Sequence, residues 1–107
     1  MDPIVQQIAK EYKAALQEIY GDDLAELILF GSYARGDQHE ESDVDFAVVF
    51  RDQHRDSFDD GVKTTKLASR LSLKYGLMVS PLTTNFQKKQ SSMMGVYQEI
   101  RKEGIVI

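Results

Sequence analysis

The amino-acid sequence predicts one domain of the mixed α/β (α+β) class, with a small mixed β-sheet flanked by helices on one face. The length of 107 residues suits a single core, so residues 1–107 are expected to form one domain. Apolar residues at helical spacing alternate with short, continuous apolar runs typical of strands. These segments follow in the order helix, strand, strand, helix, strand, helix, which favours a sheet covered by helices.

The first half of the chain predicts a helix followed by two strands. Asp2 can cap the helix and Pro3 suits its first position, while Gly21 ends it. The runs "LAELILF" (residues 24–30) and "VDFAVVF" (residues 44–50) are the two strands. The apolar stripe expected to face the core from the helix comprises Ile4, Ile8, Tyr12, Ala15, Leu16 and Ile19.

The second half predicts a helix, a strand and a last helix. Ser57 can cap the middle helix, and Gly76 ends it. In the third strand, residues 77–84, Pro81 lacks an amide hydrogen and therefore implies an edge strand or a bulge. Asn85 opens the last helical region, and residues 105–107 are a short strand or a docked tail. The core residues expected from the two helices are Phe58, Val62, Leu67, Leu71, Tyr75, Met93, Met94, Tyr97 and Ile100. A contact patch for a partner is the alternative for Met93 and Met94.

The composition limits the kinds of partner and site that the protein can have. The formal net charge of -4 argues against a protein that holds nucleic acid by its phosphates, which requires a basic face. The chain has no cysteine, which rules out disulfides and thiolate metal sites. Its N-terminus has no unbroken apolar core, and its longest apolar runs are far too short to span a bilayer. We therefore expect a cytoplasmic protein without a nucleic-acid or membrane partner.

The connection between the first two strands, "GSYARGDQHEESDVDF", carries the candidate chemistry. Gly31 has no Cβ and lets the backbone approach a ligand closely, and the Ser32 hydroxyl and nearby amides can donate hydrogen bonds to phosphate oxygens. Asp43 and Asp45 are one residue apart at the start of a strand, so both carboxylates point to the same face. Two such anions need a proton or a cation between them, and Mg²⁺ prefers one or two carboxylates plus substrate phosphates. These features predict a Mg²⁺ and triphosphate site, with a solvated polar turn as the alternative.

The spacing of this motif resembles that of a known superfamily. Gly31-Ser32, ten further residues and Asp43-Val44-Asp45 resemble the G-S-x10-D-x-D signature of the DNA polymerase β-like nucleotidyltransferases. The segments "GSYARGD" and "SDVDF", and the tail "VYQEIRKEGIVI", are most similar to the minimal, MNT-type members. The resemblance implies the minimal nucleotidyltransferase fold, with phosphate binding by Gly31 and Ser32 and with Asp43 and Asp45 as the catalytic, Mg²⁺-binding pair. Arg35 would assist with the phosphates.

Two details of the motif leave alternatives. Arg35 could instead pair with Asp37 or Glu41. Superfamily members with three carboxylates place the third on the later strand, where this chain has Ser80. A serine cannot bind metal as an anion or accept a proton near neutral pH. The protein therefore works with two carboxylates, receives a group from a partner or from loop acids such as Glu40, or has weak or no activity.

The resemblance also implies a partner and a reaction. MNT-type proteins are typically paired with HEPN-domain RNases that act as toxins, and they serve as antitoxins. The implied reaction is transfer of AMP from ATP to a tyrosine hydroxyl of the HEPN protein. The alternatives are a non-catalytic antitoxin that neutralises its toxin by binding and, third, a small-molecule nucleotidyltransferase of the aminoglycoside type. Either a homo-oligomer or a hetero-oligomer is compatible with the sequence.

Overall fold

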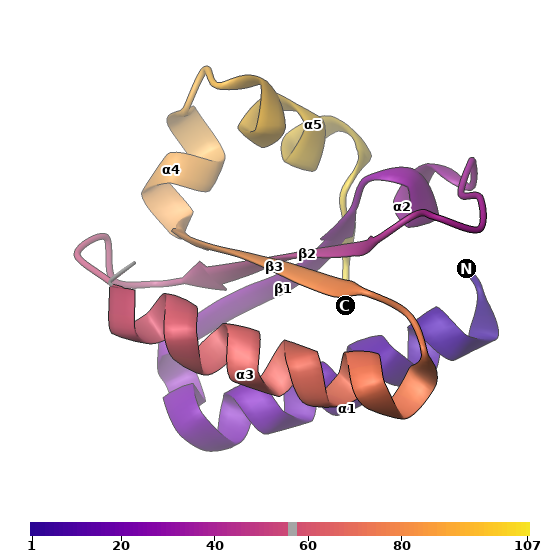
Figure 1. Ribbon diagram of the computed structural model, residues 1–107. Helices are drawn as coiled ribbons and strands as arrows, with labels where there is room; N and C mark the ends of the chain where they lie inside the picture. The colour runs from indigo at the N-terminus through magenta and orange to yellow at the C-terminus, as the bar shows by residue number, and fades with distance from the viewer. Residues whose placement is uncertain (56–57) are drawn as a thin grey trace.

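The protein is built around a four-stranded mixed sheet, shown by a computed structural model that describes residues 1–55 and 58–107 (Figure 1). The strands lie in the order β3-β2-β1-β4. The elements in chain order are α1 (Pro3–Tyr20), the short 3-10 helix η1 (Gly21–Asp23), β1 (Leu24–Phe30), α2 (Ser32–Arg35), β2 (Val44–Phe50), α3 (Phe58–Tyr75), β3 (Val79–Asn85), α4 (Phe86–Ser91), α5 (Gly95–Glu103) and β4 (Ile105–Val106).

The pairing of the strands places the candidate motif at one end of the sheet. β1 and β2 are antiparallel, and the motif connects them. β3 runs parallel to β2 after the crossover through α3, and β4 adds antiparallel to the other side of β1. β3 is therefore an edge strand, which confirms the interpretation of Pro81, and the tail forms the predicted short strand.

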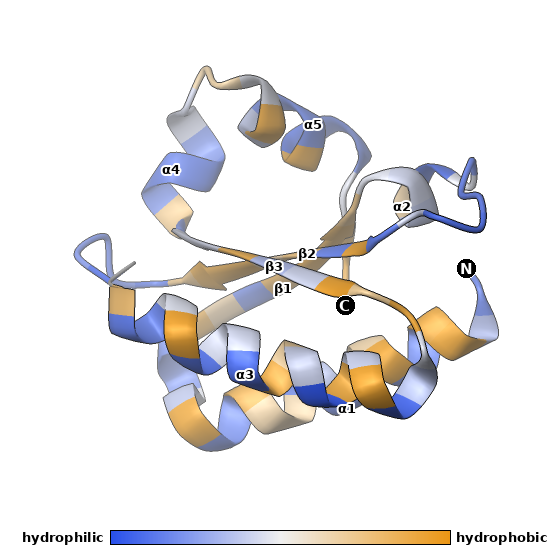
Figure 2. Ribbon diagram, viewed as in Figure 1, coloured by the Kyte–Doolittle hydropathy of each residue, from blue (hydrophilic) through white to orange (hydrophobic). Residues whose placement is uncertain are grey.

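Helices cover both faces of the sheet, although the sequence predicted helices on one face. The mixed α/β class and the mixed sheet are confirmed, but α1 and α3 pack below the sheet in Figure 1 and α4 and α5 above it. The reason is that the central strands are apolar on both sides, so both sides need cover. Phe46 and Val48 belong to the core with α1, whereas Ala47 and Val49 belong to a second core with α5. Figure 2 shows the apolar central strands between the two helical layers.

The two long helices form as predicted, with shifted buried faces. Asp2 caps α1, because its Oδ1 accepts the Ile4 amide hydrogen at 2.8 Å. Ile4 and Ile19, expected in the core, are each 49% exposed, since the buried stripe runs through Val5, Ile8, Ala9, Tyr12, Leu16 and Tyr20. In α3, Phe58 and Val62 are also exposed, because the helix meets the sheet through Thr64 and Ala68. The predicted cap Ser57 lies outside the described residues.

The last helical region is divided in two. Asn85 caps α4 as predicted, with its Oδ1 accepting the Lys88 amide hydrogen at 2.9 Å. The chain then leaves the helix before α5 begins, so Met93 and Met94 are 77% and 65% exposed, and their assignment to the core was wrong. Tyr97 and Ile100 are buried as expected. In the described part of the chain, none of the helices is both long and apolar enough to cross a membrane.

Candidate functional site

The turn after β1 brings the backbone of Gly31 against the side chain of Asp45. Gly31 has φ +77° and ψ -157°, a backbone conformation that is essentially restricted to glycine. A Cβ at this position would lie 2.5 Å from Asp45 Oδ2. The glycine is therefore required both by its dihedral angles and by the close approach of the carboxylate. The amide groups of Ser32 and Tyr33, in the first turn of α2, have no acceptor within that helix.

Asp45 occupies a central position in the sheet. It pairs with Phe30 of β1 on one side and with Ser80 of β3 on the other. Side chains alternate along a strand, and Val44 and Phe46 face α1, so Asp45 faces the α5 side. Within the described residues, neither Asp45, which is half-buried, nor the exposed Asp43 has a hydrogen bond or an ion pair of its side chain.

The electrostatics of the site favour a cation. Burial raises the pKa of Asp45, and the negative charges of Asp43 and Glu99 raise it further, while the Arg35 charge lowers it. A carboxylate near other anions and without a partner is costly to ionise unless a cation neutralises it. The donor oxygens of Asp43 and Asp45 are of the kind that Mg²⁺ prefers. Among the residues described, no group of three or more His, Cys, Asp or Glu side chains is arranged to hold a metal, so the pair would need further ligands from substrate or water.

Arg35 is the cation nearest in sequence to the turn, and three carboxylates bind it. Its Nε donates to Asp37 Oδ2 at 3.2 Å, and its Nη1 donates to Glu99 Oε1 at 2.7 Å and to Glu103 Oε2 at 3.2 Å. The pairing with Asp37 was one predicted alternative, whereas Glu41 is not among the described partners. Sequence reasoning missed the two glutamates of α5. Their spacing of four residues, which places both on one helix face, was the available signal.

Ser80 lies where a carboxylate of β3 would reach the site. The parallel register pairs it with Asp45, and partners across parallel strands share a face of the sheet. The third acidic group of the superfamily pattern is therefore absent from the strand position beside Asp45. Glu40 and Glu41 are exposed in the loop, and Asp37 is bound to Arg35.

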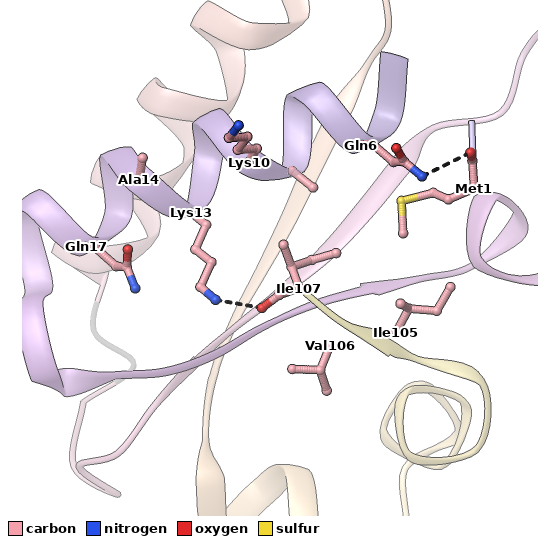
Figure 3. Close-up of a pocket in the computed structure, with 10 residues that line it drawn as sticks. Met1, Gln6, Lys10, Lys13, Ala14, Gln17, Ile105, Val106 and Ile107 are labelled. Carbon is pink, nitrogen blue, oxygen red and sulfur yellow. Dashed lines mark hydrogen bonds between the residues drawn. The ribbon is translucent and has the colours of Figure 1, made fainter. Parts of the chain in front are cut away.

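A cavity of about 530 Å³ lies elsewhere, between α1 and β4 (Figure 3). Its floor is apolar, with Ile105, Val106 and Ile107, and its polar groups include Lys10 and Lys13. The Lys13 Nζ donates to the Ile107 carbonyl oxygen at 2.7 Å, which ties the tail to α1. None of the motif residues from Gly31 to Asp45 lines this cavity, so it is separate from the site described above.

The fold and the turn agree with the nucleotidyltransferase resemblance of the sequence, and comparison with known proteins shows the family. Residues 9–106 match the family model of the nucleotidyltransferase domain, and the chain belongs to this family. The predicted resemblance and the predicted enzyme class are thereby confirmed.

Two relatives from Methanocaldococcus jannaschii share much of the chain, and each is named "Putative protein adenylyltransferase". One is 45% identical over 76 residues, covering 71% of this chain and 75% of the relative. The other is 36% identical over 101 residues, covering 92% of both chains.

Solved structures share the fold at lower identity. A structure described as a "putative minimal nucleotidyltransferase" has a TM-score of 0.60 and 21% identity, covering all of this chain and 97% of the other. A toxin-antitoxin crystal structure with AMP-PNP has a TM-score of 0.56 and 23% identity, covering 89% of this chain and 68% of the other. These similarities support the minimal nucleotidyltransferase fold.

Proposed function

We propose that this protein is a cytoplasmic antitoxin that transfers AMP from ATP to a tyrosine hydroxyl of a HEPN-domain RNase toxin. In this proposal Asp43 and Asp45 are the catalytic pair that holds Mg²⁺, and Gly31, Ser32 and Arg35 bind the nucleotide. The observation that carries the proposal is the half-buried Asp45 carboxylate, which lies against the Gly31 backbone without a protein partner among the described residues. Such an arrangement is costly in a protein that binds nothing there.

The relatives and the fold support the choice of substrates. Both M. jannaschii proteins are named as protein adenylyltransferases, which supports AMP as the transferred group and a protein as the acceptor. A structure with the same fold belongs to a toxin-antitoxin pair and contains AMP-PNP, which supports ATP as the donor and a toxin as the partner. The HEPN domain and the tyrosine follow from the sequence motif and its resemblance to MNT-type antitoxins.

Each residue of the turn has a distinct task in this mechanism. Gly31 lets the triphosphate approach the backbone, while the Ser32 hydroxyl and the two amides that begin α2 donate hydrogen bonds to phosphate oxygens. Asp43 and Asp45 would hold Mg²⁺, which, when bound, aligns the triphosphate and offsets charge on the leaving pyrophosphate. The tyrosine oxygen forms its bond to the α-phosphorus as the bond to pyrophosphate breaks. Ser80 cannot accept the tyrosine proton near neutral pH, so the proton leaves to solvent or to the partner.

One observation favours a second candidate function. The serine opposite Asp45 leaves this strand without the third carboxylate, which suits an antitoxin that retains the fold and neutralises its toxin by binding alone. The two functions differ in a single outcome, the covalent modification of the partner.

The experiment combines the protein with its proposed HEPN-domain partner, ATP and Mg²⁺, followed by intact mass spectrometry of both chains. We expect the partner to gain whole AMP units with the wild-type protein and none with Asp45→Asn. Glu18→Gln, which neutralises an exposed acid on α1, is the matched control and should retain full transfer. A stable complex in which neither chain changes mass would select the binding antitoxin instead.

A further inference from the structure

Arg35 makes several ion pairs, whereas the Asp45 carboxylate of the same site makes none with the described residues. Arg35 is shared by Asp37, Glu99 and Glu103, whereas Asp45 has no ion pair among the described residues. The backbone nevertheless brings the two residues to the same turn, because the Arg35 amide donates to the Gly31 carbonyl oxygen at 3.1 Å and Gly31 lies against Asp45 Oδ2. Burial raises the pKa of Asp45, and the Arg35 charge lowers it. Arginine readily forms charge-assisted hydrogen bonds with carboxylates, yet none joins the described residues Arg35 and Asp45. The structure therefore raises the question of what keeps them apart.

The helix α5 holds the acids that bind Arg35 in place. Tyr97 and Ile100 of α5 pack into the second core together with Phe30, which precedes Gly31, and Ala47, which follows Asp45 by two residues on the same face of β2. This packing anchors the helix over the sheet face to which Asp45 points. Glu99 precedes Ile100 and makes the shortest of the three contacts with Arg35, at 2.7 Å.

We propose that Glu99 is a positioning residue that holds the Arg35 guanidinium away from Asp45, so that the Asp43 and Asp45 carboxylates stay open to a divalent cation. This inference rests on the cation site of the proposed function. Without Glu99, Arg35 retains two weaker contacts, both at 3.2 Å. Its charge can then turn to Asp45 and compete with the metal from within the protein. Glu103 contributes less, because its removal leaves the 2.7 Å contact intact.

The test is a titration of the isolated protein with Mn²⁺, in the absence of ATP and partner, with free Mn²⁺ measured by electron paramagnetic resonance. We expect Glu99→Gln to weaken Mn²⁺ binding about tenfold, the lower end of the effects seen when groups around metal ligands are changed. Glu103→Gln, the matched control on the same helix face, should change it less than about threefold. The double variant Arg35→Gln/Glu99→Gln should bind Mn²⁺ at least as tightly as the wild type, because the internal competitor is gone.

The double variant separates positioning from a merely structural contribution. If Glu99 only stabilised α5, adding Arg35→Gln would not restore Mn²⁺ affinity, and that result would overturn the inference. Equal Mn²⁺ affinity of Glu99→Gln and wild type would overturn it as well. Arg35→Gln alone provides an independent measurement, and weaker binding than wild type would contradict the idea of a competitor.

The proposed function fails in a different way. If the wild type binds no Mn²⁺, or if Asp45→Asn binds it equally well, the cation site itself is absent and both proposals fall. If Asp45→Asn abolishes binding while Glu99→Gln leaves it unchanged, the cation site stands and the positioning role of Glu99 is rejected.

Discussion

Replacing Gly31 with alanine is the sharpest test of the turn that builds the site. The dihedral angles φ +77° and ψ -157° belong to a region essentially closed to residues with a side chain, at a cost of about 1 to 3 kcal/mol. The added Cβ would also lie 2.5 Å from Asp45 Oδ2, so the carboxylate must rotate away. We therefore expect Gly31→Ala to lower the free energy of unfolding by about 2 kcal/mol and to abolish binding of a divalent cation.

Gly36→Ala is the matched control, because it changes the other end of the same short helix. Gly36 also has a positive φ, +83°, but a Cβ there meets nothing within 4 Å. Its substitution should cost about 1 kcal/mol in unfolding free energy, as for other residues placed in the left-handed region, and should leave cation binding unchanged. Urea unfolding followed by circular dichroism measures the stability, and a Mn²⁺ titration measures the site. If Gly31→Ala matched Gly36→Ala in both assays, the contact between Gly31 and Asp45 would have no role.

Three further predictions test the charges and the packing. Asp45→Asn should be more stable than wild type at pH 7 by about 0.5 to 1 kcal/mol. Burial and the Asp43 charge raise the pKa of Asp45, so the wild type loses stability as this carboxyl ionises. In urea unfolding below pH 3.8, the difference between the two proteins should vanish. Tyr20→Phe removes a 3.2 Å hydrogen bond to buried Asp60 and should lower the free energy of unfolding by about 1.5 kcal/mol at pH 8. Burial raises the pKa of Tyr20 from 10 to about 12, so the wild type should lose this extra stability as the pH rises from 10 to 12. A stability difference that stays constant up to pH 12 would contradict the role of this hydrogen bond. Gly104→Ala brings a Cβ to 2.6 Å from Ile28 Cγ2 and against the Ile100 carbonyl oxygen, so thermal unfolding should show a free energy of unfolding lower by about 1 to 3 kcal/mol. Gly95→Ala is the control, because a Cβ at that position meets nothing within 4 Å and the substitution should not lower the stability.

The strands and the motif were predictable because their signals are local. Residues 24–30 and 44–50 form β1 and β2 with the predicted bounds, since each is a continuous apolar run between polar turns. The third strand begins at Val79, two residues later than predicted. The one-residue spacing of Asp43 and Asp45 predicts a common face, and Gly31 was predicted to let the backbone approach a ligand. What the structure shows is the Gly31 backbone against Asp45 Oδ2.

The features that were missed depend on tertiary structure. Ile4 and Ile19 fit a helical stripe as well as Val5 and Tyr20 do, and only the position of the sheet decides which stripe is buried. The last helical region likewise divides into α4, which ends at Ser91, and α5, which begins at Gly95, and its sequence contains no proline to mark the break. Two of the partners of Arg35, Glu99 and Glu103, lie 64 and 68 residues away in the sequence. Their spacing indicates a common helix face, but it does not identify Arg35 as the residue that they bind.

Helix α5 couples the stability of the fold to the charge of the site. Its apolar side, with Tyr97 and Ile100, closes the second core, and its acidic side, with Glu99 and Glu103, binds Arg35 beside the carboxylate pair. A substitution that loosens the apolar side would therefore also move the acids and alter the balance between Arg35 and a divalent cation at Asp45. In a sheet covered by helices on one face alone, the turn after β1 would have no such counter-charges. The layer formed by α4 and α5 was not predicted from the sequence. It nevertheless contributes to the charge environment of Arg35 and Asp45, which were predicted as site residues.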